Sequence, residues 1–359
     1  MDKLVVKELN TFYNGKTVLI TGSTGFKGSW LALTLKSFGA RVVGYALPPN
    51  SNLDLFVSAN IEGVLDKCYF NDIMDYSKLQ NVFIEEKPEI VFHLAAQALV
   101  LDSYEDPKTT YNTNVMGSLN VLECVRKIKG VKSLIYVTSD KAYANNEWIW
   151  GYRENDRLGG HDPYSSSKAA AEILFSSYSN SFFKNKSVGL CSVRAGNVIG
   201  GGDFSKDRIV PDCVKSFWSN KPVELRMPKA TRPWQHVLEP LGGYILLGMR
   251  AYNDPSRFNG SWNFGPNVNS VRSVQELTEA IGSYFEYREI YIYDSNSNKH
   301  EAGLLHLNCD KANQRLGWSP LWNFEKTIER TCKWYTSTKL GFLDTQKITL
   351  EDINNYFQI

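Results

Sequence analysis

Tyr164 and Lys168 are a pair of residues whose types and spacing suggest chemistry. On a helix, residues four apart lie on one face, about one turn from each other. A lysine ammonium near a phenol favours the phenolate, which lowers the pKa of the tyrosine and suits it to proton transfer. The alternative is two surface residues on a helix. The pair follows a glycine-rich loop and a predicted strand in chain order, which favours the catalytic interpretation.

A second polar group, Ser139-Asp140-Lys141, follows the predicted strand 133–138. Ser139 could donate a hydrogen bond to a substrate hydroxyl or carbonyl group. Asp140 and Lys141 are adjacent ionisable residues at a strand terminus, where α/β enzymes place their active sites. A structural salt bridge or a loop cap is the alternative for this acid and base.

A glycine-rich loop lies between the first predicted strand and the first predicted helix. Its glycines, Gly22, Gly25 and Gly28, are three residues apart. In a dinucleotide-binding turn, such glycines permit the tight bend, let the backbone approach a pyrophosphate, and let the helix lie close to the strand. A plain turn is the alternative, but the position between strand and helix favours cofactor binding.

The end of the second predicted strand, near Tyr45 to Leu47, carries neither the acid typical of NAD sites nor an arginine for NADP. We expect NAD, with NADP as the alternative. Asp72 could bind the adenine amino group or cap the helix that begins at Tyr76. The small residues at the end of the fourth strand would let a dinucleotide pass. The expected cofactor-binding residues are Gly22, Thr24, Gly25, Phe26, Lys27, Gly28, Asp72, Ile73, Leu94, Ala95, Ala96, Gln97, Thr113, Tyr164 and Lys168.

Strand-like and helix-like segments alternate through the first half of the chain. Strands are predicted at 16–20, 41–47, 67–70, 90–95, 133–138 and 187–193, and helices at 30–38, 76–87, 111–127 and 165–183. This alternation indicates an α/β fold, a Rossmann-type doubly wound parallel sheet with helices on both faces. We expect a dinucleotide-binding domain at 10–190 and a smaller mixed C-terminal domain at 191–335, some segments of which return to the first. The tail 336–359 is unassigned.

The composition is that of an ordinary globular protein: 359 residues, 43% hydrophobic and 22% charged, with a net charge of +2. It argues against a disordered chain and gives no support for a nucleic-acid or membrane partner. The six cysteines are far apart and the five histidines have no ligand-like spacing, so we expect no metal and free thiols in a reducing cytoplasm. No signal peptide or membrane span is predicted.

These motifs together resemble the extended short-chain dehydrogenase/reductases that act on nucleotide sugars. The resemblance covers about residues 12 to 330. Among these enzymes the chain is most similar to the CDP-glucose 4,6-dehydratases. The segments that carry this similarity are Thr138 to Lys141, Trp148 to Glu154, Gly200 to Asp203 and Arg232 to Val237.

The resemblance implies a mechanism. Tyr164, helped by Lys168 and Ser139, would take the proton of the sugar 4-hydroxyl while hydride passes from C4 to the nicotinamide. Lys141 would then remove the C5 proton and Asp140 would protonate the departing 6-hydroxyl, before hydride returns to C6. A 4-epimerase or 4-reductase is the alternative, and it would need no C5 base or C6 acid. A non-catalytic dinucleotide sensor is a third possibility.

The resemblance also implies a site for the substrate diphosphate and pyrimidine. The arginine fork suits phosphate oxygens, and the candidates are Arg194, Asn197, Arg208, Arg226 and Arg232. Leu101 stands where a basic residue is expected, and Leu304 where the family usually has tyrosine. By analogy with the family, we expect a homodimer or homotetramer built from the helices at about 111–127 and 165–183.

Overall fold

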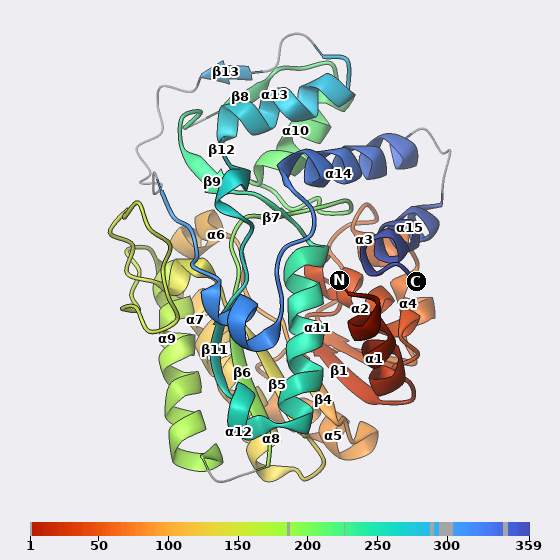
Figure 1. Ribbon diagram of the computed structural model, residues 1–359, viewed down its shortest axis with the longest axis vertical. Helices are drawn as coiled ribbons and strands as arrows, with labels where there is room; N and C mark the ends of the chain where they lie inside the picture. Colours follow the sequence, from red (N-terminus) through yellow and green to blue (C-terminus); the bar gives the residue numbers. More distant parts are fainter. Residues whose placement is uncertain (1, 185–186, 226, 288–290, 294–303, 340–343) are drawn as a thin grey trace.

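The computed structural model describes residues 2–184, 187–225, 227–287, 291–293, 304–339 and 344–359. A seven-stranded sheet forms its centre, with strand order β11-β6-β5-β4-β1-β2-β3 and every neighbouring pair parallel (Figure 1). Its strands are β1 (Thr17–Thr21), β2 (Arg41–Ala46), β3 (Lys67–Phe70), β4 (Ile90–His93), β5 (Ser133–Val137), β6 (Gly189–Arg194) and β11 (Gly260–Asn263). The predicted doubly wound fold is confirmed, and the predicted strands lie within about two residues of the observed ones.

Helices cover both faces of this sheet, because successive strand side chains point to opposite sides. Val18 and Ile20 enter one hydrophobic core and Leu19 enters the other. The first core is covered by α1 (Lys3–Tyr13), α2 (Phe26–Ser37), α11 (Leu238–Asn253) and α15 (Thr345–Phe357). The second is covered by α5 (Tyr76–Glu86), α8 (Ser118–Lys127) and α9 (Pro163–Tyr178).

Two predicted helices are interrupted by wider helical turns. The segment predicted as one helix at 111–127 consists of α7 (Pro107–Tyr111), the wide turn η1 (Asn112–Gly117) and α8. The segment predicted at 165–183 is α9 followed by the wide turn η3 (Ser179–Phe183). Helix α9 begins two residues earlier than predicted, because Pro163 occupies its first turn and Asp162 caps it by accepting a hydrogen bond from the Ser165 amide.

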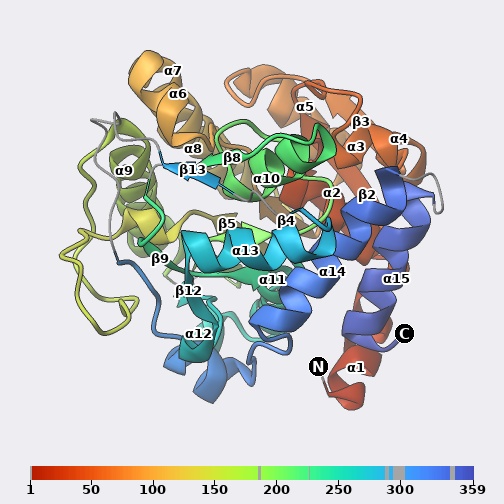
Figure 2. The same cartoon turned by 90° about the horizontal axis from the view of Figure 1, so that it is seen from above.

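A smaller group of elements lies over the carboxyl ends of the strands, as Figures 1 and 2 show. Three two-stranded ladders pair β7 with β10, β9 with β12, and β8 with β13. Segments after residue 190 also return to the sheet, where β11 pairs with β6 and α11 packs on β5 and β6. The elements of this second half and its connections are β7 (Val198–Ile199), β8 (Val223–Leu225), β9 (Thr231–Pro233), β10 (Gln235–His236), β12 (Val271–Ser273), β13 (Tyr291–Tyr293), α10 (Ile209–Trp218), α12 (Pro255–Phe258), α13 (Val274–Tyr284) and α14 (Phe324–Lys339).

Both chain ends belong to the body of the protein. Tyr13 of α1 is fully buried and donates to the carbonyl of Ile245 in α11. In α15, Ile353 and Phe357 are fully buried in the same core. The tail 336–359, which the sequence left unassigned, therefore contains a helix packed beside α2.

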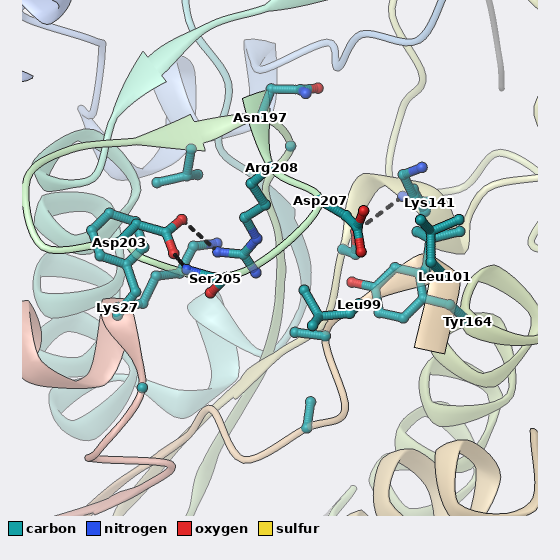
Figure 3. A pocket seen from close by; sticks show the side chains of 18 of the residues that line it. Lys27, Leu99, Leu101, Lys141, Tyr164, Asn197, Asp203, Ser205, Asp207 and Arg208 are labelled. Atoms are coloured by element: carbon teal, nitrogen blue, oxygen red, sulfur yellow. Dashed lines mark hydrogen bonds and ion pairs between the residues drawn. The ribbon is translucent and has the colours of Figure 1, made fainter. Parts of the chain in front are cut away.

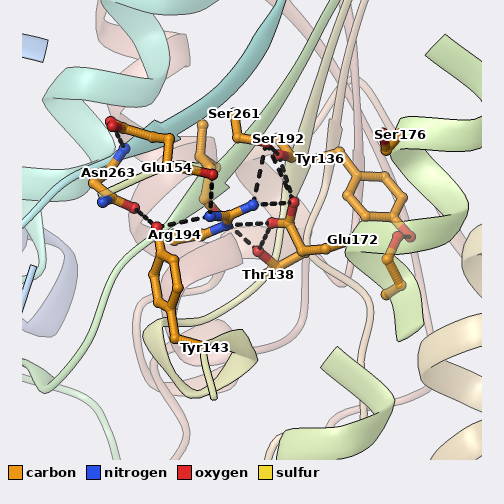
Figure 4. Close-up of polar contacts among 12 residues, drawn as sticks. Tyr136, Thr138, Tyr143, Glu154, Glu172, Ser176, Ser192, Arg194, Ser261 and Asn263 are labelled. Carbon is orange, nitrogen blue, oxygen red and sulfur yellow. Dashed lines mark hydrogen bonds and ion pairs between the residues drawn. The ribbon is translucent and has the colours of Figure 1, made fainter. Parts of the chain in front are cut away.

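A buried ion pair joins α9 to three strands of the sheet (Figure 4). Arg194, at the end of β6, donates from Nη2 to Glu172 Oε2 at 2.8 Å and from Nε to Glu172 Oε1 at 3.0 Å. Both side chains are at most 2% exposed. Hydroxyl groups of β6, β11 and the residue after β5 complete the network through Ser192, Ser261 and Thr138. Burial alone would raise the pKa of Glu172, but Arg194 and these hydroxyl groups hold it below its usual value.

We expect Glu172→Gln to reduce the free energy of unfolding by about 3–5 kcal/mol, because it leaves the Arg194 guanidinium buried without its counterion. Denaturant unfolding at neutral pH would measure the change. The matched control is Glu329→Gln, which breaks an exposed pair with Lys326 and should cost less than about 1 kcal/mol. Equal losses in the two variants would contradict the importance given to this network.

Candidate active site

One large cavity of about 1270 Å³ opens at the carboxyl ends of the central strands. It lies where the strand order reverses between β1 and β4, the place where open α/β sheets bind their ligands. Its walls come from the glycine loop, the ends of β2, β4 and β5, the start of α9, and the elements of the second half of the chain. The cavity is therefore a cleft between the carboxyl ends of the strands and the smaller group of elements that lies over them.

The glycine loop is shaped by close backbone contacts. Gly22 has a φ of +77°, and a Cβ there would lie 2.7 Å from the amide nitrogen of Ala95. A Cβ on Gly28 would lie 2.1 Å from the carbonyl oxygen of Gly22, so any side chain would push α2 away from β1. Helix α2 begins at Phe26, and its N-cap Gly25 has no side chain to satisfy the first amide groups. These N–H groups are available to a phosphate.

The residues expected to bind the cofactor line this cavity, with one exception. Gln97 lies behind the wall: its side-chain amide donates to the Leu99 carbonyl and to Thr110. Asp72 lines the cavity and accepts a hydrogen bond from the Met74 amide, whereas Asp75 is the residue that caps α5. The alternative that Asp72 caps this helix is therefore wrong.

Tyr164 and Lys168 lie on α9 with their side chains buried against the cavity, and the Lys168 Nζ is 6.0 Å from the centre of the Tyr164 ring. Burial raises the pKa of Tyr164 to about 12, although a hydrogen bond with Ser139 opposes the rise. Burial, together with the charge of Lys27, lowers the pKa of Lys168 to about 8. The predicted lowering of the tyrosine pKa by Lys168 is not what this structure shows, because burial has the larger effect on the phenol.

Asp140 and Lys141 are at the same wall of the cavity. Asp140 is 3% exposed, and its Oδ1 accepts a hydrogen bond of 3.0 Å from Ser139. Burial raises the pKa of its carboxyl group, with Lys141 and Ser139 opposing the rise. A Cβ at Gly196 would lie 1.9 Å from Asp140 Oδ2, so the glycine makes room for the acid. Lys141 is half-buried, and among the described residues it makes no direct ion pair with Asp140.

Figure 3 shows how these groups face one another: Tyr164 and Lys141 with Leu99 and Leu101 on one side, Lys27, Asp203 and Arg208 on the other. Leu101, which replaces the expected basic residue, contributes to an apolar part of the wall. Leu304 is not among the lining residues, although its neighbour Leu305 is, and its carbonyl accepts a hydrogen bond from Asn145.

The candidates for substrate binding separate into two groups. Asn197, Arg208 and Arg232 line the cavity. Arg194 does not, because its guanidinium is occupied by Glu172, Tyr143 and Ser261 in the network described above. Its expected contact with the substrate is replaced by a structural role, and Arg226 lies outside the described residues.

Two acidic residues that fix arginines were missed from the sequence, one at the cavity and one behind it. Asp203 accepts a 2.7 Å hydrogen bond from Arg208 and so fixes the guanidinium at the cavity. Glu172 fixes Arg194. Each acid could be recognised only by its closeness to an arginine, which the fold reveals and the sequence does not. For Asp203 and Arg208, the separation of five residues along the chain is a weak local indication. Within the described residues, no group of histidine, cysteine and acidic side chains could hold a metal ion.

The comparisons with known proteins agree with this geometry. A family model described as GDP-mannose 4,6 dehydratase matches residues 19–331. A Salmonella typhimurium protein named CDP-glucose 4,6-dehydratase is 47% identical over 329 residues, which are 90% of this chain and 91% of that protein. The predicted resemblance to nucleotide-sugar 4,6-dehydratases is thus confirmed. No described helix has the length and apolar character to cross a bilayer.

Solved structures share the fold. Epimerase Mth375 from Methanothermobacter thermautotrophicus superposes with a TM-score of 0.81 at 25% identity, covering 94% of this chain and 97% of that one. The dTDP-glucose 4,6-dehydratase from Bacillus anthracis in complex with NAD superposes with a TM-score of 0.76 at 22% identity, covering 91% of this chain and 98% of that one. The family match spans the sheet, the glycine loop and the cavity residues alike, and the chain belongs to the GDP-mannose 4,6 dehydratase family.

Proposed function

We propose that this chain catalyses the NAD-dependent 4,6-dehydration of a nucleotide hexose and that CDP-glucose is its substrate. The observation that carries the proposal is the pair Asp140 and Lys141 at the cavity wall, following Ser139. Epimerisation or reduction at C4 would use Tyr164 and Ser139 and would need no further acid and base. The identity with the CDP-glucose 4,6-dehydratase of Salmonella typhimurium supports this choice of nucleotide and sugar.

The cavity fits a dinucleotide, because Gly22 brings the loop against the end of β4, Gly28 brings α2 against the loop, and the first N–H groups of α2 are open. In this proposal the loop and Thr24 to Gly28 hold the pyrophosphate, and Asp72 and Ile73 the adenine end. Bound NAD would supply the hydride acceptor for C4 and the hydride donor for C6. The absence of an arginine among the described residues from Tyr45 to Asn50 favours NAD over NADP.

Oxidation at C4 needs a group that removes the hydroxyl proton. Tyr164 would accept this proton at its phenol oxygen, and Ser139 would donate a hydrogen bond to the same sugar oxygen. With a pKa of about 8, Lys168 keeps its positive charge at neutral pH. Its ammonium lies 6.0 Å from the centre of the Tyr164 ring, and in this proposal its charge would favour the phenolate against the effect of burial.

Loss of water then needs a base at C5 and an acid at C6. The 4-ketone makes the C5 proton acidic, and Lys141 would remove it from the half-buried position at the cavity wall. Asp140 would protonate the departing 6-hydroxyl. Its burial raises the carboxyl pKa, so Asp140 holds its proton closer to neutral pH than an exposed aspartate does.

The diphosphate and pyrimidine would lie toward the second half of the chain. Arg208, held by Asp203, and Arg232 would bind phosphate oxygens, with Asn197 beside them. We also propose a reducing cytoplasmic location, since all six cysteines are free thiols.

We further propose a homodimer formed through α8 and α9. Apolar side chains on or next to these helices are exposed in the single chain: Met116 at 46%, Ile173 at 60% and Phe182 at 43%. A second copy would cover them. We expect sedimentation at working concentration to give twice the monomer mass, and Ile173→Glu to shift the protein to monomer. A wild-type monomer would contradict this assembly.

The substrate proposal is tested by incubating the protein and NAD with CDP-, dTDP-, GDP- and UDP-hexoses and following products by mass. We expect CDP-glucose to lose one water. Loss of water from another nucleotide sugar alone would retain the reaction and change the substrate. A product of unchanged mass with altered C4 configuration would indicate a 4-epimerase instead.

Two variants separate the steps. Lys141→Met should lower dehydration by about 100-fold or more, because a general base contributes at least that factor. Oxidation at C4 should persist, so NADH absorbance accumulates without loss of water. Tyr164→Phe should abolish both signals, whereas Tyr178→Phe, on the same helix with its hydroxyl on Glu123, should keep both. Full dehydration by Lys141→Met would remove Lys141 from the mechanism.

A further inference from the structure

Lys27 is a cation of the glycine loop that the proposed reaction does not use. It lies in the first turn of α2 and lines the cavity. Among the described residues, no carboxylate or carbonyl forms a hydrogen bond or ion pair with its ammonium group. Burial and the neighbouring charge of Arg208 lower its pKa to about 8, while Asp140 and Asp203 oppose the shift.

The nearby acids are already engaged elsewhere. Asp203 accepts hydrogen bonds from the Arg208 guanidinium and from the Ser205 amide. Asp140 accepts one from Ser139. Lys27 and Arg208 therefore face the same part of the cavity, where Asp203 is paired with Arg208 and not with Lys27 (Figure 3). A half-buried cation without a counterion is less stable than a paired one, and an anionic ligand in the cavity would supply the missing partner.

The backbone and side chain of Lys27 point to different ligands. Its amide belongs to the open N-terminus of α2, which in the proposed function binds the pyrophosphate of the cofactor. Its side chain extends to Arg208 and Asp203, on the side assigned to the diphosphate of the substrate. Two diphosphates would thus approach each other across this lysine, and without a cation between them they would repel.

Resting on the proposed function, we propose that Lys27 is a shared counterion for both diphosphates and that it couples cofactor binding to nucleotide binding. The same free energy must appear in both directions, since linkage is reciprocal. Arg208 alone does not supply this coupling, because Asp203 already neutralises much of its charge.

The test is the dissociation constant of NAD measured by calorimetry on the full chain, with and without saturating CDP. In the wild type we expect CDP to leave NAD affinity unchanged or to increase it. In Lys27→Met and in Lys27→Gln, CDP should weaken NAD binding by about tenfold, within the range usual for coupled sites. NAD should weaken CDP binding by the same factor. Lys27→Arg should restore the wild-type pattern.

Lys36→Met is the matched control, because it removes one positive charge from the other end of α2, where Lys36 pairs with Asp66. It should behave as the wild type. If Lys27→Met weakened NAD binding relative to the wild type by the same factor with and without CDP, Lys27 would serve the cofactor alone and the coupling would be overturned. If the variant weakened CDP binding by the same factor with and without NAD, Lys27 would serve the substrate alone, which would also overturn the coupling. Failure of wild-type protein to bind NAD or CDP would instead refute the proposed function, and this inference with it.

Discussion

The position of the active-site residues on α9 depends on the ion pair between Glu172 and Arg194, neither of which lines the cavity. Glu172 lies one helical turn beyond Lys168 and two beyond Tyr164, on the face of α9 that meets the sheet. Its bidentate contact with Arg194 fixes the rotation and height of that helix against β5, β6 and β11. A charge pair excluded from water tolerates little displacement, because each partner alone would be buried without compensation. The position of the phenol and the ammonium follows from this constraint.

Burial is the common cause of the unusual proton affinities around the cavity. It raises the pKa of Tyr164 and Asp140 and lowers the pKa of Lys168 and Lys27, and in each case the neutral form gains. A site in this condition is poor in counterions and ready for charged ligands. The phosphates of the proposed cofactor and substrate would bring negative charge and so raise the proton affinity of the ionisable groups near them.

The sequence could predict what depends on local patterns. Alternating apolar segments gave the strands, and the three-residue spacing of Gly22, Gly25 and Gly28 gave the cofactor loop, because backbone proximity excludes side chains there. Arg194 was misjudged since its type suits phosphate, and only the fold shows Glu172 opposite it. Gln97 does not line the cavity, and a strand-end position could not predict this because it does not specify which way a side chain turns. The residues that line the cavity from β7 to α10 depend on long-range packing, which no local pattern encodes.

The last two helices carry a consequence for engineering the chain. Trp334 of α14 lies against Gly201, where even a methyl group would clash with its ring, and the Tyr335 hydroxyl donates to the carbonyl of Asp203. Helix α15 supports this arrangement through the hydrogen bond between Thr349 and the Trp334 indole. The loop that presents Arg208 is thus braced by residues near the C-terminus. Shortening the C-terminal segment would therefore free the loop that holds Arg208 at the mouth of the cleft.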